Sequence, residues 1–388
     1  MSFITNIRSV AKYESKILVR SWFFRIFTLL AVVFLGFFNF AMMLMEDNFG
    51  LWFAKSVSSN IPYLNLLLLN TGQAVVAVFL SSEFLKRDKK LDTSEVFYVR
   101  PLSNAEYVIG KIWGNLRVFL LLNLLVLAIV LAFNFMASGI TVDWQAYGVY
   151  FLLISLPTLI FIIGLSIFLM LVLRNQALTF ILLLGYIGLT LFYIQDKFYY
   201  LFDYMVYNLP LFKSTIVGFS SLELILNHRA IYFFAGLGFI FFTIFLFKRL
   251  PNARRSHYPW LFLSLCMFLL AGTAGYRHVR SILREGEIRG LYTSINNKYV
   301  HEPKMAIDWY DISVEQKPET IRSVVGMKGT ALATSEIFTF CLNPGLKVGE
   351  VKEGEKPLDF KREEQILAVD FGRKIEKGDT ISLSICYE

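Results

Sequence analysis

Seven separate stretches of about 20 apolar residues dominate this sequence, and none of them contains a charged side chain or a histidine. An α-helix rises 1.5 Å per residue, so each stretch is long enough to cross roughly 30 Å of hydrocarbon. With 56% hydrophobic and 18% charged residues, the chain is too apolar for a single water-soluble globule. The sequence therefore predicts a polytopic membrane protein. The expected spans are residues 26–45, 61–82, 118–136, 147–173, 177–195, 230–247 and 258–275.

The basic residues alternate between the two sides of these spans. One side carries 17 Lys and Arg in the N-terminal segment and in the loops after spans two, four and six. The opposite loops carry four, namely Lys55, Lys197, Lys213 and Arg229. The positive-inside rule places the basic side, with the N-terminus, in the cytoplasm and residues after the seventh span outside. This distribution indicates loops beside anionic lipid rather than a nucleic-acid partner.

The first 20 residues have the pattern of a helix that lies on the membrane. Phe3, Ile7 and Leu18 belong to an apolar face, and a basic stripe of Arg8, Lys12, Lys16 and Arg20 recurs every fourth residue. This stripe would bind anionic lipid. The alternative is a solvated cytoplasmic extension.

No energy source for transport is visible in the chain. The sequence has no Walker motif and no His-Glu-x-x-His zinc motif, and the expected spans have no ionisable side chain for ion coupling. We therefore expect no enzymatic activity and no cofactor in this chain. Neutral polar residues Asn70, Gln73 and Asn123 lie within spans, where they could line a pathway or join neighbouring helices.

The loop between spans two and three is the most informative segment. Ser103 and Glu106 have the spacing of a capping box, which predicts a helix that begins there and runs into span three. A short charged stretch upstream ends in Phe97 and Tyr98, and such an apolar tip suits a groove on a soluble partner. The alternative is a solvated charged loop.

Around the capping box the loop carries the motif residues Pro101, Leu102, Ser103, Glu106, Gly110 and Lys111. In these residues it resembles the first cytoplasmic loop of type-2 ABC transporter permeases. Members of that family have an N-terminal interfacial elbow helix, six spans, and short external helices between spans five and six. The resemblance implies a coupling helix that contacts a separate ATPase subunit, which would hold ATP and Mg²⁺. It assigns that contact to Lys89, Lys90, Leu91, Asp92, Glu95, Phe97 and Tyr98.

The same resemblance implies a bacterial inner-membrane protein. A second permease subunit, identical or different, would complete the pathway, and export of an unknown substrate is the expected direction.

The last third of the chain has a different pattern. Short alternating segments separated by turn residues predict an antiparallel β-domain. Cys341 and Cys386 could form a disulfide there or remain free thiols. The expected strands are residues 306–315, 320–327, 336–342, 346–351, 365–371 and 380–387.

Within this region, Tyr310-Asp311, Asn343-Pro344-Gly345, Arg362-Glu363 and Gly378-Asp379 resemble the N-terminal β-domain of aminopeptidase N-like zinc peptidases. The chain as a whole therefore resembles the permeases of Bacteroidetes-type bacteria that are fused to such a periplasmic peptidase. The zinc site has no counterpart in this sequence, so the resemblance implies either a fragment or a permease with a β-domain stub. An alternative function is therefore a membrane anchor for a periplasmic zinc aminopeptidase.

The expected fold is an all-α polytopic bundle of six spans plus a seventh, followed by an antiparallel β-domain. The expected parts are an elbow helix at 1–25, a six-span permease domain at 26–250, a seventh span at 258–275, a partly helical linker at 276–305 and a periplasmic β-domain at 306–388.

Overall fold

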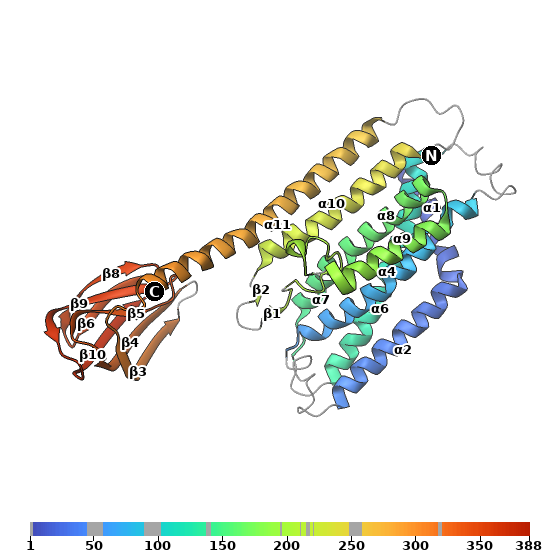
Figure 1. Ribbon diagram of the computed structural model, residues 1–388. Helices are drawn as coiled ribbons and strands as arrows, with labels where there is room; N and C mark the ends of the chain where they lie inside the picture. Colours follow the sequence, from blue (N-terminus) through green and yellow to red (C-terminus); the bar gives the residue numbers. More distant parts are fainter. Residues whose placement is uncertain are drawn as a thin grey trace. The chain divides into compact units, whose positions relative to one another are not determined.

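The computed structural model divides into two compact units, Met1–Ser281 and Ile282–Glu388 (Figure 1). The first is helical and the second is built from β-strands. The structure describes residues 3–44, 57–88 (backbone only for 82–88), 102–136, 141–194, 196–209, 211–214, 218–219, 221–247, 258–316 and 320–388.

Seven helical segments of the described chain are long and apolar enough to cross a membrane. The chain therefore has the architecture of a multi-pass membrane protein. These segments are α2 (Trp22–Leu44), α4 (Asn60–Asp88), α6 (Asn104–Met136), α7 (Trp144–Tyr150) with η1 (Phe151–Ser155) and α8 (Leu156–Leu173), α9 (Gln176–Leu189) with η2 (Thr190–Ile194), α10 (Leu222–Leu246) and α11 (Tyr258–Lys298).

Helices α4 and α8 form the enclosed centre of the first unit, whereas α2, α9 and α11 expose most of their apolar surface. The pair α8 and α10 packs with backbones in direct contact. A Cβ built on Gly164 would lie 2.7 Å from the carbonyl oxygen of Gly236. Small residues permit this close approach, which is a common way to pack helices in membranes.

Two expected helix boundaries were wrong, and the structure adds detail to two other segments. The first span begins at Trp22 rather than residue 26, directly after α1 (Phe3–Arg20). The sixth begins at Leu222 rather than residue 230, so His228 and Arg229 are helical instead of lying in a loop. The expected linker continues α11 as helix through Lys298. The loop after the fifth span holds only the short 3₁₀ turn η3 (Phe198–Tyr200) and the strand pair β1 (Lys213–Ser214) and β2 (Gly218–Phe219) among its described residues.

The second unit contains two antiparallel sheets. The larger has the order β3-β4-β10-β6-β7 and the smaller β5-β9-β8. Alternate residues of β10 point into the core, where Ile381, Leu383 and Ile385 are buried as their spacing predicts. The strands are β3 (Met305–Gln316), β4 (Ile321–Ala331), β5 (Ser335–Cys341), β6 (Val348–Glu353), β7 (Lys356–Pro357), β8 (Asp359–Glu363), β9 (Ile366–Ile375) and β10 (Thr380–Tyr387).

The six expected strands are all present, and β7 and β8 were missed. Strand β8 reads Asp-Phe-Lys-Arg-Glu and lies at the edge of its sheet, where charged residues are tolerated. Its composition therefore lacks the apolar alternation that marks a half-buried strand. Cys341 and Cys386 are both free and lie in different sheets.

Candidate functional site

Helix α1 is fixed to the N-terminal half of α6, and this contact, here called the α1–α6 joint, contains most of the loop motif. The capping box predicted at the start of α6 is confirmed. The Ser103 backbone N–H donates to Glu106 Oε2 at 2.6 Å, and the Glu106 N–H donates to Ser103 Oγ at 3.2 Å. The second carboxylate oxygen of Glu106 accepts a hydrogen bond of 2.8 Å from Asn6 Nδ2 of α1. One side chain therefore caps α6 and holds α1.

Two glycines of α6 allow the backbones of the joint to meet. A Cβ built on Gly110 would lie 2.7 Å from the Val10 Cβ and 3.1 Å from the Ile7 carbonyl oxygen. One built on Gly114 would lie 2.9 Å from the Ala11 carbonyl oxygen. All three distances are shorter than ordinary van der Waals contact, so a larger residue at either glycine would push α1 away.

Charged and polar groups close the joint between the helices. Lys111 Nζ lies 3.5 Å from the Glu14 carboxylate, and both side chains are almost fully buried. Ser15 Oγ donates to the Gly114 carbonyl oxygen at 2.7 Å, and Arg117 Nη2 donates to the Ala11 carbonyl oxygen at 3.1 Å. The face of α1 that meets α6 therefore includes the polar residues Glu14 and Ser15, to which the sequence pattern had assigned no face.

The whole expected ATPase contact lies outside the described residues, namely Lys89, Lys90, Leu91, Asp92, Glu95, Phe97 and Tyr98. Pro101 of the loop motif also lies outside them. Leu102 is half-buried just before the capping box. Of the loop motif, Glu106, Gly110 and Lys111 thus contact α1 at the joint, and Ser103 completes the capping box beside them.

Sequence comparison adds no relative. No model of a known protein family matches the chain, and no curated protein matches it.

The neutral polar residues of the spans form one buried network. Asn123 Nδ2 donates to Gln73 Oε1 at 2.9 Å, and Gln73 Nε2 donates to Asn70 Oδ1 at 2.6 Å. Ser155 Oγ of η1 joins by donating to Asn123 Oδ1 at 2.8 Å. All four side chains are fully buried. These bonds join α4, α6 and η1. Asn70, Gln73 and Asn123 therefore connect neighbouring helices, which is one of the two roles that the sequence left open.

A buried arginine, which the sequence pattern had placed in a loop, joins α10 to the fourth span. Pro157 has no N–H, so the carbonyl oxygen of Leu153 lacks its helical donor. Arg229 Nε donates to that oxygen at 2.6 Å, and Nη2 donates to Thr158 Oγ1 at 2.8 Å. The π-helical turn η1, which includes Leu153, is a geometry often found at functional positions. No local sequence pattern marked this pair, because the two groups lie 76 residues apart.

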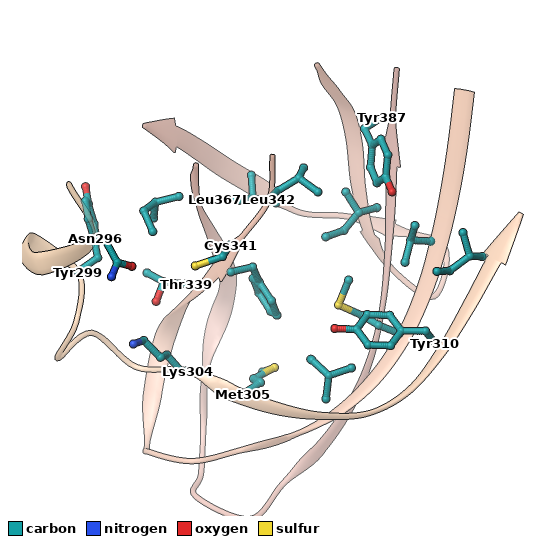
Figure 2. A pocket seen from close by; sticks show the side chains of 17 residues that line it. Asn296, Tyr299, Lys304, Met305, Tyr310, Thr339, Cys341, Leu342, Leu367 and Tyr387 are labelled. Carbon is teal, nitrogen blue, oxygen red and sulfur yellow. The ribbon is translucent and has the colours of Figure 1, made fainter. Parts of the chain in front are cut away.

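The second unit has an open cleft of about 430 Å³ between its two sheets (Figure 2). Tyr310 and Ile312 of β3 line one wall and remain more than half exposed, because the smaller sheet does not cover this edge strand. Cys341 and Leu367 lie on the opposite wall (Figure 2). Across the described ranges, no group of three His, Cys, Asp or Glu side chains could hold a metal ion.

At one end of this unit, Glu363 joins β8 to the end of α11. Its carboxylate accepts hydrogen bonds from the Tyr299 hydroxyl at 2.5 Å and from Lys298 Nζ at 2.9 Å. The bond from Tyr299, followed by that from Lys298, lowers the pKa of Glu363 below its usual value. The strand β8, absent from the sequence prediction, is therefore anchored to the helix through a charged group.

Proposed function

We propose that this chain is the membrane-spanning permease subunit of an ABC transporter, and that it exports its substrate. The observation that carries the proposal is the α1–α6 joint, where an amphipathic N-terminal helix is fixed to the start of a span by Glu106, Gly110 and Lys111. These residues belong to the loop motif that resembles type-2 permeases. The seven membrane-competent helices support the same proposal.

The distribution of basic residues, 17 against four, supports an orientation with the joint at the cytoplasmic face of a bacterial inner membrane. The second unit then lies in the periplasm. On the exposed side of α1, Arg8, Lys12, Lys16 and Arg20 all face solvent, which suits anionic headgroups.

The joint provides a route for mechanical coupling. In this proposal, a separate ATPase binds the segment that carries Lys89, Phe97 and Tyr98, just before α6, and supplies ATP and Mg²⁺. Closely packed backbones and a buried ion pair make α1 and the start of α6 move as one body. Closure of the ATPase would therefore displace a whole span. A second permease subunit would complete the pathway.

The test is co-purification of ATPase activity with the tagged full-length chain from its native membranes. We expect Phe97→Asp with Tyr98→Asp to abolish the co-purified activity, because two charges cannot enter an apolar groove without a large desolvation cost. The matched control is Phe360→Asp, which changes a partly exposed aromatic residue of the second unit. Undiminished ATPase recovery from the double variant would refute the proposed contact.

A further inference from the structure

The described segment 196–209, which follows η2, folds against the helical bundle. Its tip, residues 203–206, is called the plug here, and each of its four side chains is at most 1% exposed. The plug packs among three helices. The Tyr204 ring stacks on Tyr186 of α9 with 5.5 Å between centroids, and it lies 5.8 Å from Phe161 of α8 and 6.4 Å from Tyr232 of α10.

The backbone leading into the plug is strained. Phe198, Tyr199 and Tyr200 have φ values of 52°, 59° and 62°, and Val206 within the plug has 64°. Bulky L-residues rarely adopt this left-handed conformation, and three in succession are unusual. Such a conformation persists only where the surroundings hold it.

Four side chains supply that hold, and we call them the latch. His278 Nε2 of α11 donates to the Tyr199 carbonyl oxygen at 2.8 Å, and His228 Nε2 of α10 donates to the Tyr200 carbonyl oxygen at 3.0 Å. The Tyr232 hydroxyl donates to the Leu201 carbonyl oxygen, and Arg229 Nη1 donates to that of Tyr204 at 2.8 Å. Successive carbonyls of the loop are therefore held by α10 and α11.

Both histidines of the latch are fully buried, and their rings lie 5.0 Å apart. The Nε2 atom of each ring must carry the hydrogen that it donates to the loop carbonyl. Hydrogen bonds weaken steeply once the donor and acceptor separate beyond about 3.5 Å. A displacement of α10 or α11 by roughly 1 Å is therefore enough to break the latch bonds made by that helix.

We infer that the plug, residues 203–206, with the strained residues 198–200 that precede it, is a spring-loaded element that the latch holds in place and that is released when α10 and α11 shift. The inference rests on the proposed transport function and adds its regulation. Backbone strain favours departure of the loop, and the latch opposes it. Because α11 continues through His278 to Lys298 in the second unit, the helix that carries a latch residue also leads into that unit.

The experiment measures how fast a thiol at the plug reacts. Met205, which is 1% exposed, is replaced by Met205→Cys in the full-length chain after Cys266→Ala, Cys341→Ser and Cys386→Ser. A water-soluble maleimide is the probe, with the protein in lipid nanodiscs and no ATPase present. We expect His278→Phe and Tyr232→Phe each to raise the labelling rate about fivefold or more, the change that follows from losing one hydrogen bond.

Relief of the strain should act in the opposite direction. Tyr199→Gly keeps the carbonyl that His278 binds and removes the steric cost of φ 59°, so we expect slower labelling and partial reversal of His278→Phe. The matched control is Tyr276→Phe, because Tyr276 is exposed on α11. The control should leave the labelling rate unchanged.

Unchanged labelling in Tyr232→Phe and His278→Phe would overturn the inference. If His278→Phe lowers the yield of monodisperse protein, Tyr232→Phe decides alone, because it removes a single hydroxyl. Faster labelling together with undiminished ATPase recovery in the Phe97 and Tyr98 variant would uphold the plug and reject the proposed ATPase contact. The two failures are therefore distinguishable.

Discussion

Replacing Gly114 by alanine tests whether α1 and α6 are in backbone contact. The added Cβ would lie 2.8 Å from the Glu14 Cβ, 2.9 Å from the Ala11 carbonyl oxygen and 3.2 Å from the Ala11 Cα. Two of these atoms are backbone, so no side-chain rotation relieves the overlap. Helix α1 must move away by about 0.5 Å or more to restore ordinary contact, and this movement weakens the Ser15 bond to the Gly114 carbonyl oxygen.

The expected size follows from two opposing effects. Overpacking costs about 1–3 kcal/mol, whereas alanine is favoured over glycine in a helix by about 1 kcal/mol. Gly36→Ala in α2 is the matched control, since nothing lies within 4 Å of its added Cβ and only the propensity gain applies. The two variants should differ in stability by about 1–3 kcal/mol, with Gly114→Ala the less stable.

The assay measures the thermal unfolding midpoint of the full-length chain in detergent. Unfolding is monitored by near-ultraviolet circular dichroism. A difference of 1 kcal/mol corresponds to about 2–4 °C for domains of about 150–250 residues. Equal midpoints for Gly114→Ala and Gly36→Ala would refute the close packing of α1 on α6. The proposal that α1 and the start of α6 move as one body would then lose its structural basis.

Two further predictions concern buried and exposed charges. We expect Arg229→Leu to lower the free energy of unfolding by about 2–5 kcal/mol, because several buried carbonyl groups lose their donor. The thermal midpoint of Arg229→Lys should lie between those of Arg229→Leu and the unsubstituted protein. An unchanged midpoint for Arg229→Leu would contradict this role. The lowered pKa of Glu363 stabilises the fold above the unfolded pKa, and this contribution is lost as pH falls through the folded pKa. Glu363→Gln should therefore flatten the loss of stability on acidification below about pH 5, and an identical acid profile would argue against the Tyr299 and Lys298 contacts.

Local patterns predicted the elements whose causes are themselves local. Each span was visible because bilayer thickness requires a long apolar run, and six strands were visible from their two-residue alternation. The capping box of Ser103 and Glu106 was predictable because its donors and acceptors lie within one helical turn. Strand β8 was not, since an edge strand has no buried face to impose alternation.

Arg229 shows why a charge in the sequence does not by itself mark a loop. Its side chain is buried against the carbonyl oxygen of Leu153, which Pro157 leaves without a helical donor. Leu153 lies on a different helical segment, 76 residues before Arg229. No window along the chain contains both groups. The assignment of Arg229 to a loop failed for that reason.

The sequence alone was sufficient to specify the apolar helices, their approximate lengths and the alternating strands of the second unit. These features depend on residues that are neighbours along the chain. Tertiary packing decided three other features. It determines which face of α1 meets α6 and how Asn70, Gln73 and Asn123 form hydrogen bonds with one another. It also holds Tyr199 in a left-handed backbone conformation. Each of these depends on a partner group far along the chain, and the free energy of a buried polar or strained group is set by the partner it meets.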